Sequence, residues 1–117
     1  MYPFESQIMI RIEAVLGKND VMPISEALKE IGVGGLTVTK MRGRGKNPGP
    51  EIHASKGTEI FIPQFSDKYV IQIIAAETNE DAIIEVIKKN ATVGKIFVSP
   101  ILRAIDVPSG KEGETVI

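Results

Sequence analysis

Residues Lys68–Ala76 have the sequence Lys-Tyr-Val-Ile-Gln-Ile-Ile-Ala-Ala, a nearly continuous apolar run. Runs of this length that are rich in Ile and Val are typical of a strand buried on both faces in the middle of a sheet. The sequence therefore predicts a central strand over 68–76, and the segments on either side have to cover it.

A helix and a strand are predicted after the central strand. Thr78–Asp81 supplies a helix start with an N-cap and acidic residues in the first turn, and Lys88-Lys89 suit the C-terminal end of the helix dipole. The apolar stripe of this helix consists of Ile83, Val86 and Ile87. Lys95–Ser99 then predicts a short strand.

The C-terminal part carries weaker signals. Ile101–Val107 predicts a less regular, strand-like run, and the polar stretch after it predicts a mobile tail over about 108–117. Val116-Ile117 is apolar, and we expect it to make a last contact with the domain.

A similar strand–helix–strand unit precedes the central strand. Ser6–Val15 alternates between apolar and polar residues, which indicates a half-buried strand. Helical spacing over Val21–Ile31 predicts a helix, with Pro23 in its first turn and Gly32 as its stop. Leu36–Met41 is rich in β-branched residues and predicts a second strand.

The order of these elements predicts the fold class. Two strand–helix–strand units in one sheet give an α/β (α+β) protein with the ferredoxin-like βαββαβ sandwich, in which both helices cover one face of a four-stranded antiparallel sheet. We expect residues 1–117 to form a single domain. Apolar strand residues that point to the opposite face predict oligomerisation through that face.

A long segment, residues 43–64, separates the two units and holds four glycines and three prolines. Long irregular segments in compact domains tend to be functional, so we expect a flexible, protruding loop with strand-like stems, notably Glu59–Ile62. Between Lys40 and Lys56 there are five basic side chains and one acid, Glu51. Glycine-rich turns can point several N–H groups at an anion, so the base of this loop suits phosphate.

The overall composition excludes several classes of function. The net charge of −1 argues against a general nucleic-acid or membrane-surface binder, and the short basic patch at 42–46 has no interleaved aromatic residues. There is no cysteine, His53 is the only histidine, and no paired carboxylates stand out, so we expect neither a metal site nor a catalytic residue. Without a signal segment or an apolar run of ~20 residues, a cytoplasmic protein is expected.

Together these segments resemble the PII signal-transduction family. The resemblance spans roughly residues 8–110 and is carried by Ile24–Lys40, Arg42–Gly45, Gly57-Thr58-Glu59, Lys68–Ala76 and Gly94–Val98. It implies a ferredoxin-like homotrimer that binds adenine nucleotides in clefts between subunits. It also implies that the long loop reaches out to target proteins in a shape that depends on the ligand.

The resemblance implies specific site residues. Thr37 and Thr39 match adenine-side contacts, Ile74 matches the residue on which the adenine packs, and Gly94-Lys95 match a glycine amide and a lysine that contact phosphates. Lys68 matches a lysine involved in 2-oxoglutarate binding. The expected nucleotide-binding set is Thr37, Thr39, Arg42, Gly43, Arg44, Gly45, Lys46, Ile74, Gly94 and Lys95, with Lys56, Lys68 and Arg103 as further candidates for phosphate contacts.

The chain departs from the family pattern at several positions. Asn90–Val93 replaces a longer glycine-bearing phosphate loop, and two C-terminal arginines are replaced by Asp106 and Pro108. Asn47 stands for a glutamine that helps to hold Mg²⁺ and 2-oxoglutarate, and Ile60 stands for a loop tyrosine that is uridylylated in enteric relatives. Each lost guanidinium removes charge-assisted bonds worth about 1.5–3 kcal/mol. We therefore expect a divergent member in which ADP approaches or exceeds ATP in affinity and 2-oxoglutarate does not bind usefully.

The predicted function is that of a sensor of ATP or ADP, with Mg²⁺ accompanying ATP, that regulates a transporter or metabolic enzyme through its loop; the target classes are family analogy. A slow ATPase in the same cleft is an alternative, although the sequence offers no evident general base. A PII-like sensor of another small ligand, such as AMP, a cyclic nucleotide or bicarbonate, is a further alternative. Nucleic acid is not expected as a partner, nor is direct insertion into a membrane.

Overall fold

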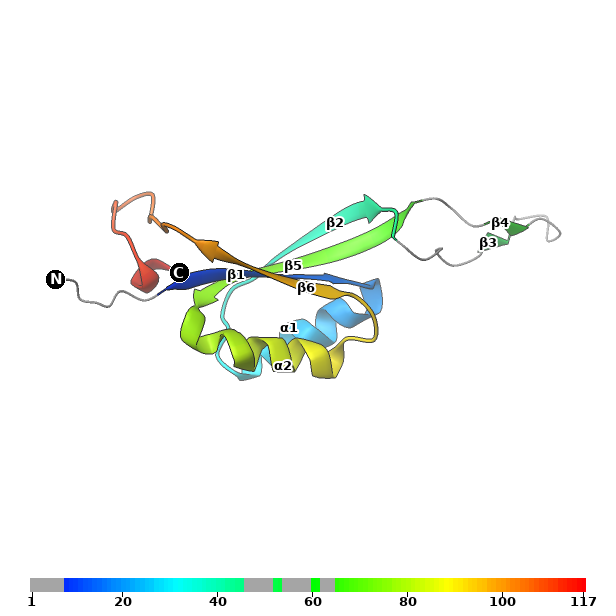
Figure 1. The fold of residues 1–117 in the computed structure, drawn as a ribbon, viewed down its shortest axis with the longest axis horizontal. Coiled ribbons are helices and arrows are strands. Elements are labelled where there is room, and N and C mark those ends of the chain that lie inside the picture. Colours follow the sequence, from blue (N-terminus) through cyan, green and yellow to red (C-terminus); the bar gives the residue numbers. More distant parts are fainter. Residues whose placement is uncertain (1–7, 46–51, 54–59, 62–64) are drawn as a thin grey trace.

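A computed structural model describes residues 8–45, 52–53, 60–61 and 65–117. Its body is a four-stranded antiparallel sheet with both helices on one face (Figure 1). The strands are β1 (Met9–Leu16), β2 (Thr37–Gly43), β5 (Ser66–Ala76) and β6 (Lys95–Ile101), and the helices are α1 (Val21–Glu30) and α2 (Glu80–Asn90). The strand order β2-β5-β1-β6 is the one that the ferredoxin-like prediction requires.

Short elements complete the chain. The 3₁₀ turns η1 (Lys18–Asp20) and η2 (Glu77–Asn79) lead into α1 and α2, and η3 (Glu114–Val116) lies near the C-terminus. Within the segment 43–64, β3 (Ile52–His53) pairs with β4 (Ile60–Phe61), away from the main sheet (Figure 1). Residue 60 thus lies in a strand, in line with the predicted strand-like stem, whereas Lys46, Asn47 and Lys56 lie outside the described residues.

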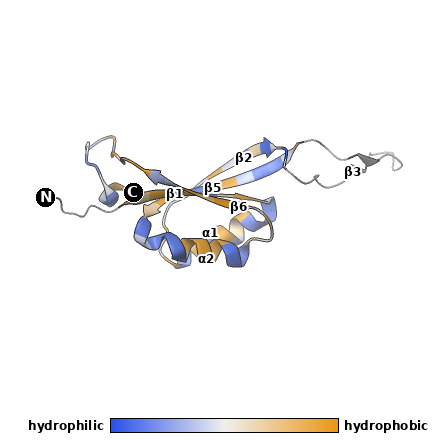
Figure 2. Cartoon of the chain, in the orientation of Figure 1, coloured by the Kyte–Doolittle hydropathy of each residue, from blue (hydrophilic) through white to orange (hydrophobic). Residues whose placement is uncertain are grey.

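The hydrophobic core lies between the sheet and the helices, where Figure 2 shows hydrophobic residues concentrated. Side chains alternate across a strand, so every second residue of β1 and β5 points at the helices. The largest fully buried side chains are Ile12, Ile24, Leu28, Ile71, Ile73, Ile83 and Ile87. All are aliphatic, and the predicted stripes of both helices supply part of this set.

The sheet face away from the helices, here called the open face, is mixed in character. The register aligns its side chains in rows across the strands, because residues directly opposite each other share a face. One row consists of Thr39, Val70, Val15 and Lys95, and the next of Thr37, Gln72, Glu13 and Phe97. In the single chain these side chains are half-buried or exposed, so the prediction that β5 is buried on both faces holds for one face only.

Two local predictions need correction. Asn79 precedes α2, but its side chain makes no capping hydrogen bond. The strand-like run predicted over 101–107 is found only at Ile101, where β6 ends, and at Ile105, which forms an isolated bridge to Glu112. The chain leaves the sheet there since the Asp106 carboxylate accepts bonds from the Ser109 backbone N–H (3.2 Å) and hydroxyl (2.7 Å), which closes a turn. That the tail over 108–117 is mobile stays a prediction.

Candidate functional site

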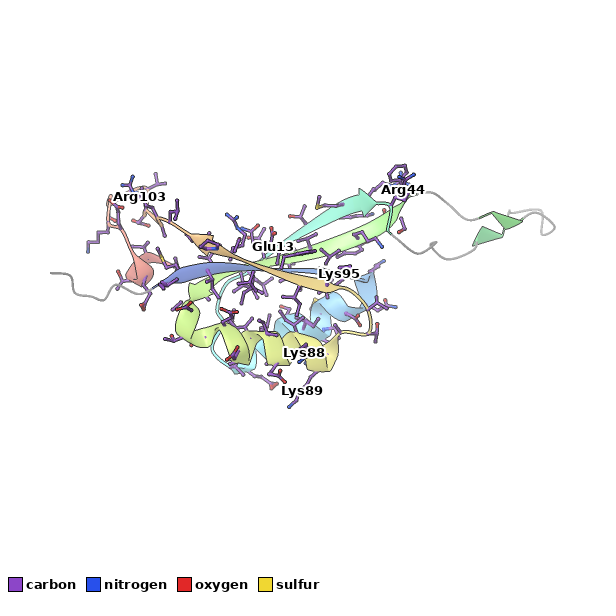
Figure 3. The ribbon with its side chains drawn as sticks, in the orientation of Figure 1. Glu13, Arg44, Lys88, Lys89, Lys95 and Arg103 are labelled. Atoms are coloured by element: carbon purple, nitrogen blue, oxygen red, sulfur yellow. The ribbon has the colours of Figure 1, made fainter. Side chains whose placement is uncertain are left out.

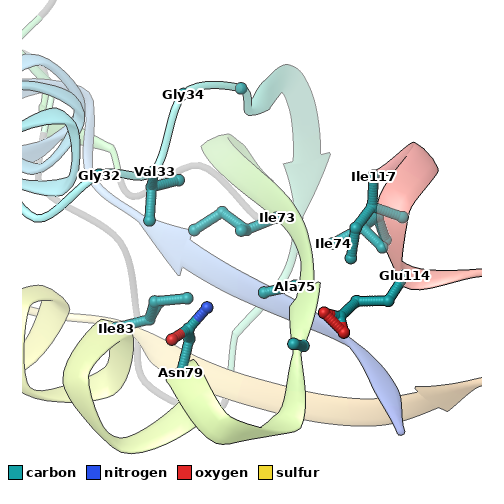
Figure 4. A pocket seen from close by; sticks show the side chains of 12 residues that line it. Gly32, Val33, Gly34, Ile73, Ile74, Ala75, Asn79, Ile83, Glu114 and Ile117 are labelled. Atoms are coloured by element: carbon teal, nitrogen blue, oxygen red, sulfur yellow. The ribbon is translucent and has the colours of Figure 1, made fainter. Parts of the chain in front are cut away.

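A cavity of about 360 Å³ lies at the free edge of β5. β2 pairs with β5 only as far as Thr37 opposite Gln72, so Ile73–Ala76 have no strand neighbour on that side. A free sheet edge offers unpaired backbone N–H and C=O groups. The glycine-containing connection Gly32–Gly35 lines the cavity opposite this edge (Figure 4). The cavity thus combines apolar side chains with backbone hydrogen-bonding groups, a combination that suits a flat heterocycle.

The C-terminus lines the other side of this cavity. Figure 4 shows Glu114 and Ile117 beside Ile74, and Asn79 and Ile83 contribute from the α2 side. Of the predicted site residues that the structure describes, only Ile74 lines the cavity. The expected last contact of Val116-Ile117 is confirmed for Ile117. Glu114 and Asn79 are not in the predicted site, because only the fold brings these distant segments to one edge.

A second group of predicted residues lies at the opposite end of the sheet, where β2 ends and β6 begins. Gly94 precedes β6 and Lys95 begins it, with Lys95 on the open face opposite Val15. Gly43 ends β2 beside Lys68, whose Cγ lies 3.6 Å from the position that a Cβ on Gly43 would take. Lys68 and Lys95 therefore bring two cationic side chains to one face and one end of the sheet. We call this the loop end, and the cavity side the pocket end.

The two ends are well separated within one chain. Lys68 and Ile74 are six residues apart on β5, which corresponds to about 20 Å. Lys95 and Thr39 share a row but lie on the two edge strands, three strand spacings or about 14 Å apart. A single chain therefore presents the predicted site as two halves.

Arg42 lies on the other side of the sheet. Because it is opposite Asp67 in the register and alternates with Met41 and Gly43, its side chain is on the helix side, away from Thr37 and Thr39. The Asp67 carboxylate forms ion pairs with Arg42 Nε at 3.9 Å and with Lys40 Nζ at 3.5 Å. All three side chains are exposed, so these ion pairs are weak. Arg42 and the strand threonines therefore lie on opposite faces of the sheet, and a phosphate contact from Arg42 stays a prediction.

Arg103 is committed to another partner. Its Nε and Nη2 donate to the two carboxylate oxygens of Glu112 at 2.9 and 3.0 Å. This bidentate hydrogen bonding and the opposite charge raise the pKa of Arg103 and lower the pKa of Glu112. Figure 3 shows Arg103 at one end of the molecule and Arg44 at the other. Within one chain, Arg103 does not join the phosphate candidates at the loop end.

Two further findings concern other kinds of site. Among the described residues, no group of three His, Cys, Asp or Glu side chains lies close enough together to hold a metal ion. Within the same part of the chain, neither helix is long and apolar enough to cross a membrane.

Comparisons with known proteins agree with this fold. The family model described as nitrogen regulatory protein P-II matches residues 9–111. The nitrogen regulatory protein P-II of Rhizobium meliloti is 33% identical over 110 residues, which cover 90% of this chain and 96% of the relative. The solved structure of B. subtilis GlnK has a TM-score of 0.74 and 25% identity, and the match covers 94% of this chain and 99% of GlnK.

A structure of the B. subtilis GlnK–ATP complex has the same TM-score of 0.74 at 24% identity, covering 94% of this chain and 98% of GlnK, and this likeness concerns the fold. The family match extends over most of the sequence, from β1 to the turn after β6. The relative at 33% identity spans both strand–helix–strand units and the segment between them. This chain therefore belongs to the P-II family of nitrogen regulatory proteins.

Proposed function

We propose that this protein senses ATP or ADP at sites between copies of the chain and regulates a partner protein through residues 43–64. The phosphates bind at the loop end of one chain, on the Gly94 amide, Lys95 and Lys68. The adenine enters the pocket end of the neighbouring chain, where it packs on Ile74 and bonds to the free edge of β5. Thr37 and Thr39 contact the nucleotide on its adenine side.

The separation of the two half-sites carries this proposal. About 20 Å along β5 between Lys68 and Ile74 exceeds the distance from the adenine ring to the β-phosphate of an extended ADP. This backbone separation favours a site in which the loop end of one copy is set beside the pocket end of the next, so that each end holds one part of the nucleotide. Support for the ligand class comes from B. subtilis GlnK, whose structure has been solved as an ATP complex.

Assembly through the open face is part of the proposal. Arg11 lies on that face, opposite Ile74 on β5 and Ser99 on β6. Its buried Nε has no hydrogen-bond partner within the described part of the chain, and a buried donor without an acceptor is costly. Glu13, two residues along β1, lies on the same face (Figure 3). We propose that assembly into a three-fold ring supplies the missing acceptor, and that Glu13 of a neighbouring copy is that acceptor.

The signalling output follows from the position of the segment 43–64. It joins the end of β2 to the start of β5, next to the cationic residues at the loop end. A nucleotide phosphate bound there contacts the base of the segment and thereby biases which of its conformations a partner meets. By analogy with the family, the protein acts in the cytoplasm and its partner is a transporter or a metabolic enzyme.

Calorimetric titration tests the proposed ligand. ATP, ADP, AMP and 2-oxoglutarate are titrated into the protein, each with and without Mg²⁺. We expect saturable binding of ADP and ATP, with ADP at least as tight, and no saturable heat from 2-oxoglutarate. Lys95→Ala should weaken ADP binding by roughly 1.5–3 kcal/mol, because it removes a charge-assisted bond to phosphate. Unchanged ADP affinity in a Lys95→Ala variant that still assembles would contradict the proposed site.

A further inference from the structure

The short connection between α2 and β6, residues 91–94, is tied to the start of α1. The Asp20 Oδ2 oxygen accepts a hydrogen bond from the Thr92 backbone N–H at 2.9 Å and another from the Thr92 hydroxyl at 3.0 Å. Asp20 is 7% exposed and is the buried charged residue of the described part of the chain. Two segments 72 residues apart in sequence therefore meet at one carboxylate oxygen.

The fold makes this carboxylate available to the connection. Asp20 is the residue before α1, where the positive end of the helix dipole favours a negative charge. Its side chain makes no capping bond to its own helix. The bonds from Thr92 are charge-assisted, and such bonds are the stronger kind. Burial of an ionised group is tolerated here because the group is hydrogen-bonded.

The connection is fixed at a second point two residues later. Gly94 has φ +127°, and a Cβ at this position would lie 2.0 Å from the Val15 carbonyl oxygen. Only glycine fits there, because the obstructing atom belongs to the backbone of β1. Lys95 follows at once and begins β6 on the open face. The Asp20–Thr92 contact and the close approach of Gly94 to Val15 thus set where Lys95 starts.

We infer that Asp20 and Thr92 are positioning residues for phosphate binding. Their contact holds the 91–94 connection in one conformation before ligand arrives, so that the Gly94 amide and Lys95 lose little conformational entropy on binding. Asp20 itself carries the same sign of charge as a phosphate and acts through Thr92. This inference rests on the proposed function, because it assigns the two residues to the phosphate half-site.

Thr92→Val tests the inference with little risk to folding, since Thr92 is exposed and valine has the same shape. The substitution removes the hydroxyl bond to Asp20, and we expect ADP affinity to fall roughly three- to tenfold. Thr92→Ser keeps both bonds and should restore the affinity of the original protein. Adenosine has no phosphate, so its binding should be unchanged in all three proteins. A variant that weakened adenosine and ADP equally would overturn the positioning role.

A double-mutant cycle separates this inference from the proposed function. In a Lys95→Ala background, Thr92→Val should have little further effect on ADP binding, because the group that it positions is gone. An equal loss in both backgrounds would overturn the inference and leave the proposed site intact. The inference would also be overturned if Lys95→Ala weakened ADP binding while Thr92→Val and Asp20→Asn left it unchanged. If Lys95→Ala itself has no effect, the proposed phosphate half-site fails and the positioning role with it.

Discussion

The two faces of the sheet differ in what they contain and in what they do. The helix-covered face is closed by aliphatic side chains such as Ile12 and Ile73, which are 0% and 1% exposed. The open face carries Arg11, Glu13 and Lys95 among apolar residues such as Phe97, which is 54% exposed. The first face supplies the stability of the single chain, whereas the second leaves charges and apolar surface for other molecules. The alternation of side chains along the same four strands thus puts the core on one face and leaves charged and apolar surface on the other.

A core truncation should sharpen this contrast most strongly. Ile12→Ala removes a fully buried side chain from the helix-covered face, and we expect it to lower the free energy of unfolding by about 2–5 kcal/mol. Thr39→Ala on the open face is the control, with an expected change within about 0.5 kcal/mol because Thr39 is exposed. Denaturant unfolding at one fixed protein concentration measures both. Equal losses of unfolding free energy would mean that the helix-covered face does not supply more of the stability than the open face.

Gly94→Ala should have the next largest effect, because it strains the backbone where β6 joins the open face. The positive φ costs about 1–3 kcal/mol for a residue with a side chain, and the collision with the Val15 carbonyl adds to this. Gly113→Ala is the matched control, since Gly113 also has a strongly positive φ, +104°, but nothing within 4 Å of its Cβ position. Comparison of their unfolding free energies isolates the collision. Similar losses would show that the close approach to β1 is unimportant.

The proposed pairing of Arg11 with Glu13 of a neighbouring copy predicts a coupling between these two residues in assembly. Arg11→Met and Glu13→Gln should each promote dissociation of the oligomer, because each leaves the other charge without its partner. The double variant should lose less than the sum, with a coupling of about 0.5–3 kcal/mol. Light scattering across a dilution series measures the dissociation. Strict additivity would remove the two residues from the proposed interface.

The smallest effect is expected outside both faces, at the exposed pair of Arg103 and Glu112. Arg103 lowers the pKa of Glu112 in the folded protein, so the pair favours folding at pH values above the pKa that Glu112 has in the unfolded chain. That contribution is lost as the pH falls through the folded pKa. NMR titration should show the pKa of Glu112 rising in Arg103→Ala, with little change in stability because both groups are exposed. A Glu112 pKa that stays the same would show that the pair does not form in solution.

Much of the fold could be predicted because its signals are local. The alternation in β1, the apolar run of β5 and the stripe of α2 each follow from the periodicity of one segment. The end of β6 could not be predicted, since Ile105 has a suitable pattern but the Asp106–Ser109 turn carries the chain away from the sheet.

The site was predictable only in part, for a different reason. Lys95 and Ile74 belong to segments that resemble the family, but which face and which edge they occupy depends on the strand register. That register puts Arg42 on the helix side, and the path of the chain after β6 brings Glu114 to the cavity. The Asp20–Thr92 contact joins residues whose separate contexts indicate only a helix start and a loop, so nothing local in the sequence marks it.

The central claim, that each nucleotide site combines half-sites from two copies, is tested most directly by mixing two defective chains. Lys95→Ala disables the phosphate half-site, and Ile74→Ala weakens the pocket half-site. If the chains assemble at random in equal amounts into a closed ring, about one quarter of the sites should pair an intact phosphate half with an intact pocket half. Calorimetry of the co-assembled mixture should then show that fraction binding ADP with the affinity of the original protein. A mixture in which every site stays as weak as in the separate variants would contradict the account.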